Sequence, residues 1–296
     1  GYQIIEEEYG TKIDAEAFEK AVREAVLGLD EELVMDKAGC YIDPKITKED
    51  EGLRSACDTL NKYTKLTITY NVGDKREILD GEIIHRWLSV SKGKKVRIDE
   101  AQIADYVSEL ARKYNTAFRS RTLRTSYGKE IAIVGGDYGW KVDKDAEREM
   151  ILKDLNAGES VERELVYAQT ANSHGPNDYG DTYVEINLTA QHLFFYKDGE
   201  LLVESDFVSG SIAKSHATPV GAYSLTYKQK DATLRGEDYE SKVSYWMPYC
   251  GDVGMHDASW RSSFGGSIYK RNGSHGCVNL PASAAKTIFE NIEAGY

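Results

Sequence analysis

Cysteine is scarce in this chain of 296 residues: Cys40, Cys57, Cys250 and Cys277 are too few for a disulfide-stapled scaffold. No two of them have the Cys-x-x-Cys spacing typical of structural zinc. Long apolar runs are also missing, since stretches such as 131–134 and 193–196 are far too short to span a bilayer. The composition therefore excludes a disulfide miniprotein and any membrane-spanning helix within these residues.

A concentrated basic surface is missing as well. The chain has 37 Lys and Arg against 49 Asp and Glu, which gives a net charge of −12. Nucleic-acid binding requires clustered positive charge to neutralise phosphates, so we expect no nucleic-acid partner. The acidity favours solubility and identifies no partner.

The length favours two domains, because single cores rarely grow to 296 residues. In the first half, helical spacing of apolar residues predicts helices over 15–29, 99–114 and 143–155. Asp14 is the expected N-cap of the first helix, Asp99 and Gln102 resemble a capping box, and Gly158 ends the third helix. Alternating residues predict strands over 66–70 and 131–134.

After Gly158 the pattern changes to short alternating runs separated by turns. Strands are predicted over 182–187, 191–196, 201–208 and 219–225, with a hairpin turn at 197–200 and one helix over 282–292. We therefore predict an α+β protein. A mixed α/β domain over 1–163 precedes a β-rich, β-sandwich-like domain over 164–296.

Most of the chemistry is expected in two segments, 255–257 and 273–281. Gly276 directly precedes Cys277, and glycine permits a sharp turn that presents a thiol. A nucleophilic thiol requires a nearby base, and His256 and His275 are the candidates. His256 is favoured, because a base on a separate segment can be brought in by the fold and oriented by a third group.

The cysteines and histidines also have alternative interpretations, as structural residues or as metal ligands. Free cysteines are usually buried small hydrophobes, and Cys40 and Cys57 are interpreted so. Cys250 has either a structural role or a disulfide with Cys277 as the alternative. His256, His275 and Cys277 could also ligate zinc, but no carboxylate has a fitting spacing. We expect no metal and no organic cofactor.

The motif resembles a known family. His256, seventeen intervening residues and then 274–279 (Ser-His-Gly-Cys-Val-Asn) are similar to the signature of the L,D-transpeptidases with a YkuD-type catalytic domain. Segments 209–210, 218–223 and 254–258 resemble further family segments in the expected order, so the resemblance covers about 182–281. The run 135–140 resembles the peptidoglycan-binding domain that precedes this catalytic domain in Gram-positive members.

The resemblance implies a role for each motif residue. Cys277 would be the nucleophile, His256 the base, and the main-chain carbonyl of Asp257 the group that orients the base. The amides of Gly276 and Cys277 would contribute to an oxyanion hole. The residues that shape the turn and its hydrogen bonds would be Ser274, His275 and Gly276.

Substrate contacts are less defined. Many members have arginine two residues after the cysteine, whereas this chain has Asn279, which leaves open what binds the charged group of the substrate. Tyr245, Trp246 and Tyr249 precede the base and are expected either to wall the acyl-donor groove or to pack in the core.

The implied reaction is peptidoglycan cross-linking in two acyl-transfer steps. The partners would be stem peptides, with a tetrapeptide donor that loses D-alanine and an amine acceptor that forms a 3-3 cross-link. Water as acceptor would make the enzyme an L,D-carboxypeptidase. Carbapenem β-lactams are expected to acylate Cys277. We expect a location at the extracellular face of a bacterial cell envelope, with a native membrane anchor outside these residues.

Two other functions compete with this one. A papain-like cysteine peptidase would place its histidine after the cysteine, and no suitable histidine follows Cys277. A non-enzymatic wall-binding module would explain the first domain and leave the segment around Cys277 without a purpose.

Overall fold

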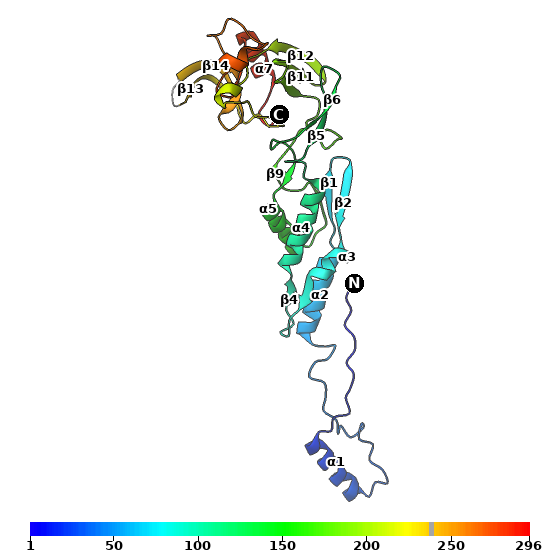
Figure 1. Ribbon diagram of the computed structural model, residues 1–296. Helices are drawn as coiled ribbons and strands as arrows, with labels where there is room; N and C mark the ends of the chain where they lie inside the picture. Colours follow the sequence, from blue (N-terminus) through cyan, green and yellow to red (C-terminus); the bar gives the residue numbers. More distant parts are fainter. Residues whose placement is uncertain (237–239) are drawn as a thin grey trace. The chain divides into compact units, whose positions relative to one another are not determined.

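The computed structural model describes residues 1–236 and 240–296 (Figure 1). Spatial clustering of the backbone gives two compact units. The first comprises Gly1–Thr69, Ile78–Ile103 and Ile151–Glu162, and the second comprises Tyr70–Glu77, Ala104–Met150 and Arg163–Tyr296. Each unit is assembled from several stretches of chain, so the predicted division after residue 163 stays a prediction.

The first unit contains the helices α1 (Ala15–Gly28), α2 (Glu51–Lys65) and α3 (Gly81–Ile84). A hairpin joins β3 (Leu88–Val90) and β4 (Val96–Ile98) after the short 3-10 turn η1 (His85–Trp87). Asp14 caps α1 by accepting hydrogen bonds from the amides of Glu16 and Ala17, both at 3.1 Å, which confirms the predicted N-cap. Asp50 caps α2, a helix that the apolar spacing did not predict.

Two predicted helices have residues in both units: α4 (Glu100–Tyr114) and α5 (Lys144–Ala157). The Asp99 half of the capping box forms, since its carboxylate accepts from the Ala101 amide. The Gln102 half is wrong. The Asp99 amide already donates to the Trp87 carbonyl, and the Gln102 side chain donates to the Arg86 carbonyl instead.

The strands β1 (Ile68–Val72), β2 (Lys75–Leu79) and β8 (Val161–Arg163) form one sheet in the order β2-β1-β8. The predicted strand at 66–70 therefore exists and begins two residues later. Gly158 ends α5 with a φ of +75°, as expected for a glycine C-cap.

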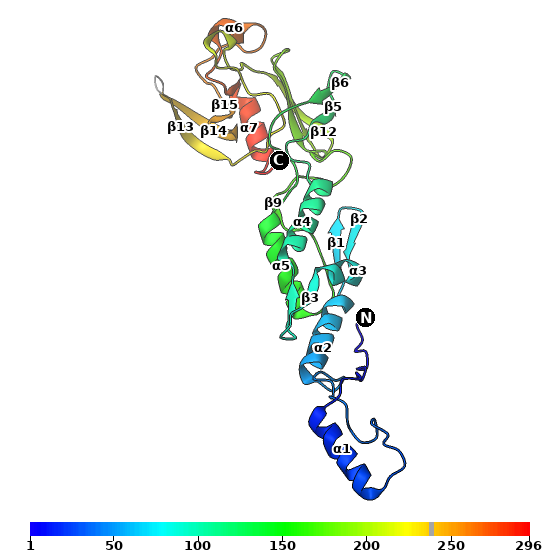
Figure 2. The same cartoon turned by 60° about the horizontal axis from the view of Figure 1, so that its bottom comes forward.

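The second unit contains two larger sheets (Figure 2). One consists of β10 (Tyr183–Asn187), β11 (His192–Lys197) and β12 (Glu200–Asp206), which confirms the three predicted strands and their hairpin turn. The other has the order β13-β14-β15-β16, with β13 (Gln229–Arg235), β14 (Glu240–Cys250), β15 (Val253–Asp257) and β16 (Val278–Leu280).

The remaining elements of this unit are shorter. They are the hairpin of β5 (Arg121–Arg124) and β6 (Glu130–Ile133), the pair of β7 (Lys141–Val142) and β9 (Tyr167–Gln169), the 3-10 turn η2 (Ile212–Lys214), and the helices α6 (Ile268–Asn272) and α7 (Ala282–Asn291). The predicted helix at 282–292 is confirmed, and α6 is an additional helix.

The predicted strand at 219–225 is wrong. Its backbone groups bond to separate segments rather than to one partner strand, since the Ala222 amide donates to Gly135 and the Leu225 amide donates to Tyr296. A ladder needs successive bonds to the same neighbour, so this stretch remains irregular despite its apolar alternation.

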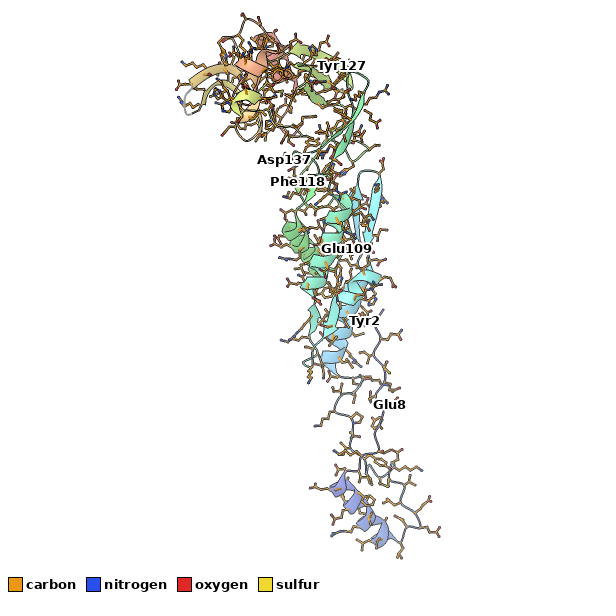
Figure 3. All side chains as sticks on the ribbon, in the orientation of Figure 1. Tyr2, Glu8, Glu109, Phe118, Tyr127 and Asp137 are labelled. Atoms are coloured by element: carbon orange, nitrogen blue, oxygen red, sulfur yellow. The ribbon has the colours of Figure 1, made fainter. Side chains whose placement is uncertain are left out.

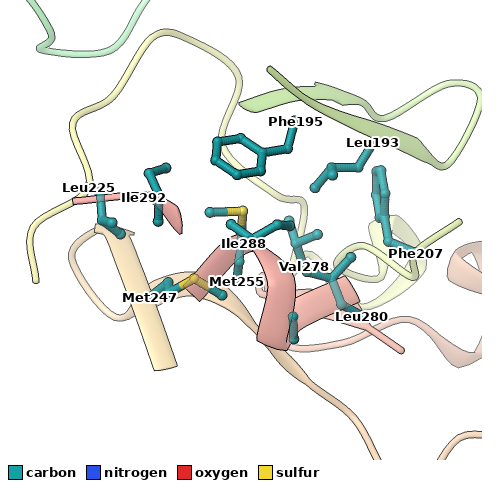
Figure 4. Close-up of a cluster of buried hydrophobic side chains, with 11 residues drawn as sticks. Leu193, Phe195, Phe207, Leu225, Met247, Met255, Val278, Leu280, Ile288 and Ile292 are labelled. Carbon is teal, nitrogen blue, oxygen red and sulfur yellow. The ribbon is translucent and has the colours of Figure 1, made fainter. Parts of the chain in front are cut away.

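The core of the second unit lies between its two sheets and α7, which contacts β12, β14 and β15 (Figure 4). Leu193 and Phe195, two residues apart on β11, point into this core. Met247, Met255 and Val278 enter it from β14, β15 and β16. The packing of two inner sheet faces agrees with the predicted sandwich-like character, and it fixes the sheet that holds the site.

The β5–β6 hairpin packs on the outer face of β11. Tyr127 at its tip, labelled in Figure 3, meets Phe194 edge to face with ring centroids 5.4 Å apart. Ser126 donates from both its amide and its hydroxyl to the Glu185 carboxylate on β10. Within the described residues, no helix is long and apolar enough to cross a membrane.

Candidate active site

His256 and Cys277 lie on neighbouring parallel strands. His256 is in β15, Cys277 immediately precedes β16, and the register pairs His256 with Asn279. Parallel strands cannot be joined by a tight turn, so residues 258–277 form a crossover between base and thiol. Two residues that are 21 positions apart in the sequence thereby reach the same edge of one sheet.

The His256 imidazole is oriented by the backbone next to it. Its Nδ1 lies 2.8 Å from the Asp257 carbonyl oxygen, and the side chain is 4% exposed. A carbonyl only accepts, so Nδ1 donates and Nε2 retains its lone pair. Burial lowers the pKa of His256, and the Asp257 carbonyl and carboxylate partly oppose this shift. The ring is therefore a neutral base with Nε2 available.

The Cys277 thiol is also buried, with 8% of the residue exposed. Its Sγ lies 3.6 Å from the Asp252 carbonyl oxygen, and Trp246 packs beside it. Burial raises the pKa of Cys277, the charge of Asp252 acts in the same direction, and a hydrogen bond to the Gly254 backbone opposes both. The resting form is thus the thiol, which needs a base to react.

The turn before Cys277 is closed by Ser274. The Ser274 hydroxyl donates to the Cys277 carbonyl at 2.5 Å and accepts from the Gly276 amide at 3.1 Å. Gly276 has a φ of +123°, a conformation that side-chain-bearing residues rarely adopt. Because the Gly276 amide is occupied, an oxyanion role for it would require the bond to Ser274 to break.

A second segment, 208–218, holds this turn from the other side. The Ser274 amide donates to Ser209 at 3.0 Å, and the Ser211 amide donates to Ser274 at 2.9 Å. The buried Thr218 hydroxyl donates to the Gly276 carbonyl at 2.7 Å and accepts from the Gly210 amide at 2.9 Å. Thr218 was part of the resemblance, but its contact with the nucleophile turn is a tertiary relationship that no local pattern shows.

His275 lies beside a second histidine. It is exposed, and its ring is 4.6 Å from that of His216, measured between centroids. His216 therefore borders the nucleophile turn. The preference for His256 over His275 as the base stays a prediction.

The predicted substrate residues divide by position. Trp246 pairs with His256 across β14 and β15, and the two ring centroids are 5.9 Å apart. Asn279 is buried opposite His256, and its Oδ1 has no hydrogen-bond partner among the described residues. Trp246 thus borders both the base and the thiol, and Asn279 lies opposite the base.

The two tyrosines are partly buried and contact other side chains. Tyr245 packs against Phe289 of α7 with ring centroids 5.3 Å apart, on the core side. Tyr249 packs on Tyr223 and lines a cavity of about 620 Å³ that Thr218 also borders. A substrate role for either tyrosine stays a prediction.

Cys250 forms no disulfide with Cys277, the alternative considered from the sequence. Cys40 is buried, Cys57 and Cys250 are partly exposed, and all four thiols are free. No group of three or more His, Cys, Asp or Glu side chains that could hold a metal occurs in the part of the chain that the structure describes.

Comparison with known protein families gives two matches. Residues 181–296 match the L,D-transpeptidase catalytic domain, YkuD, and residues 48–162 match a peptidoglycan binding domain. The comparison with curated proteins gives no match.

Solved structures extend the similarity over most of the chain. A structure of the Ldtfm–avibactam carbamoyl enzyme is 34% identical, covers 82% of this chain and 96% of its own, and has a TM-score of 0.65. A cysteine-to-serine mutant of the Enterococcus faecium L,D-transpeptidase is 34% identical, covers 80% and 96%, and has a TM-score of 0.64. With its parallel β15–β16 pair and both domain matches, this chain belongs to the L,D-transpeptidase family.

Proposed function

We propose that this protein is an L,D-transpeptidase that forms 3-3 cross-links between peptidoglycan stem peptides through a cysteine acyl-enzyme. The observation that supports this most directly is the pairing of β15 and β16, with a neutral, backbone-oriented His256 beside the Cys277 strand. The carbamoyl enzyme described for the relative is consistent with group transfer on this fold.

The first step is acylation. His256 Nε2 takes the thiol proton, and Cys277 Sγ attacks the carbonyl carbon of the third residue of a stem tetrapeptide. The C–S bond forms while the amide C–N bond breaks. The proton on His256 passes to the leaving nitrogen, and D-alanine departs.

The second step is transfer to an amine. The amine of a neighbouring stem attacks the thioester carbonyl, a new C–N bond forms, and the C–S bond breaks. His256 takes the proton from the attacking nitrogen and returns it to the sulfur. The reaction is thereby split into two displacements, each easier than a direct exchange. Water as the attacking group would give L,D-carboxypeptidase activity, the second candidate function.

The negative charge that develops on the carbonyl oxygen needs hydrogen-bond donors. The Cys277 amide is the nearest backbone candidate, and the Gly276 amide becomes available only if Ser274 releases it. We assign Ser274 the role of holding the turn, since its hydroxyl bonds both Gly276 and Cys277.

The same thiol should react with β-lactams. The relative forms a carbamoyl enzyme with avibactam. By an analogous attack of the thiolate on a strained cyclic carbonyl, we propose that carbapenems acylate Cys277. The peptidoglycan binding domain supports association with the cell wall, where both substrates and β-lactams are encountered.

The test is product analysis by mass spectrometry. Wild type and Cys277→Ala are incubated with a purified disaccharide-tetrapeptide. Loss of D-alanine together with a cross-linked dimer, both abolished in the variant, is the expected result. D-alanine release without dimer would favour the carboxypeptidase. No release by wild type with a confirmed reduced thiol would favour a wall-binding module.

A further inference from the structure

Arg261 lies in the crossover, five residues after His256. Its backbone amide donates to the Ala258 carbonyl at 3.0 Å, and its Nη1 donates to the Asn272 carbonyl at 2.9 Å. Its Nε is buried without a hydrogen-bond partner in the described part of the chain. Among residues 1–236 and 240–296, Arg261 belongs to no ion pair. The protein therefore binds one nitrogen of the guanidinium, but none of its carboxylates in these ranges balances the positive charge.

Arg261 directly follows a residue that contacts His256. The neighbouring residue, Trp260, has its ring 5.9 Å from that of His256. Burial is the main cause of the lowered pKa of His256, and the positive charge of Arg261 acts in the same direction. Burial also lowers the pKa of Arg261 itself. Partly desolvated cations in proteins are usually paired, because removing water from a charge is costly.

The proposed reaction places an anion at this position. His256 must reach the leaving nitrogen of the donor, and the next carbon of that residue bears the terminal carboxylate. The carboxylate therefore lies within a few bonds of the proton that His256 delivers. Asn279, opposite His256, is neutral and cannot supply the charge that would hold it.

We propose that Arg261 binds the terminal carboxylate of the departing D-amino acid and so selects donors with a free C-terminus. The proposal rests on the proposed function for the identity of the ligand, while the anion site itself follows from a guanidinium whose buried Nε has no partner in the described part of the chain, one residue after the Trp260 that contacts His256. Arginine suits this role because its planar group can bind both oxygens of a carboxylate.

The first test compares two donors, a disaccharide-tetrapeptide with a free terminal carboxylate and the same compound as a terminal carboxamide. Wild type should prefer the acid. Arg261→Gln should lower kcat/KM for the acid by about 10- to 100-fold and leave the amide nearly unchanged, as expected for loss of a charge-assisted hydrogen bond. Arg261→Lys should retain part of the preference. Arg271→Gln, which removes the same charge from an exposed position of α6, is the matched control.

The second test does not require turnover. Alkylation of Cys277 by iodoacetate is compared with alkylation by iodoacetamide, which differs by one negative charge. The iodoacetate-to-iodoacetamide rate ratio should fall about tenfold or more in Arg261→Gln and stay unchanged in Arg271→Gln. A ratio unaffected by Arg261→Gln, or an equal loss for both reagents and both donors, overturns the proposal. Failure of wild type to cleave either donor would instead contradict the proposed function, and the alkylation ratio would still decide on the anion site.

Discussion

The Thr218 hydroxyl donates a 2.7 Å hydrogen bond to the carbonyl of Gly276, a residue 58 positions later in the sequence. The same oxygen accepts from the Gly210 amide, so one buried side chain holds two backbone segments in place. Gly276 directly precedes the thiol, and the position of Cys277 therefore depends on a residue that has no recorded contact with its sulfur.

Thr218→Val should slow acylation of Cys277 by a carbapenem about tenfold. The change conserves the shape and leaves the Gly276 carbonyl and the Gly210 amide unpartnered, at a cost of about 1–3 kcal/mol for each buried group. The rate is measured by intact-mass spectrometry. Thr218→Ser keeps the hydroxyl and should react nearly like wild type. Equal rates for the two variants would show that the hydroxyl does not position the turn.

The pH dependence of thiol alkylation should show that Cys277 and His256 are both uncharged in the resting protein. Burial raises the pKa of Cys277 and lowers that of His256, so both shifts favour thiol and imidazole over thiolate and imidazolium. Alkylation by iodoacetamide should therefore increase steadily through neutral pH and level off only above the ordinary cysteine range. A plateau already at pH of about 6 would indicate an ion pair instead.

The lowered pKa of His256 also sets the acid limb of turnover. The base must be neutral, and its pKa lies below the usual histidine value of about 6.5. The decrease of kcat/KM on the acid side should accordingly have its midpoint below that pH. A limb above about pH 6.5 would contradict the assignment of His256 as the base.

Asp257 should stabilise the fold through its side chain, apart from its carbonyl. The buried carboxylate accepts hydrogen bonds from the amides of Ser244 and Tyr245, both at 2.8 Å. Asp257→Ala removes the acceptor for two N–H groups and should lower the free energy of unfolding by roughly 2–5 kcal/mol in urea denaturation. Asp257→Asn retains an acceptor oxygen and should lose clearly less. Equal losses would mean that these bonds are not the cause.

Gly210 should tolerate no side chain. A Cβ there would lie 1.8 Å from the His216 carbonyl oxygen and 2.8 Å from the Gly276 Cα, and backbone atoms cannot move aside cheaply. Gly210→Ala should destabilise the protein by about 1–3 kcal/mol and slow thiol alkylation. Gly10→Ala, at a position with no atom within 4 Å, is the control. Unchanged stability and reactivity in Gly210→Ala would show that the 208–218 segment adapts freely.

Local periodicity predicted the helices and strands whose buried apolar residues recur at a regular spacing within one stretch of sequence. The strands β10 to β12 and the helices α4 and α7 have regular apolar spacing, and they appear at the expected residues. The strands β13 to β16 were not predicted. β16 has three residues, and β14 includes polar residues and Pro248, which interrupt a regular apolar alternation. The stretch 219–225 alternates like a strand, but it has no single neighbour with which to form a ladder.

The motif around Cys277 and His256 could be recognised because its residues are contiguous or nearly so. The contributions of Thr218 and Arg261 could not, since both depend on which backbone groups the fold brings alongside them. A threonine before proline and an arginine in a loop have no distinguishing pattern on their own. The roles of these two residues can be identified only from the contacts that the folded chain makes.

The parallel pairing of β15 with β16 has a consequence for how such enzymes can diversify. His256 belongs to the sheet and Cys277 directly precedes β16, whereas the long connection between them, 258–276, is largely irregular and includes Arg261. Apart from the Ala258 amide, which donates to Leu280, the first part of that connection, 258–272, contributes no residue to the β15–β16 register. Exchanging this segment between two relatives should therefore change which leaving group is accepted and leave the acyl-transfer reaction itself the same. Natural sequence divergence and protein engineering can both use this separation.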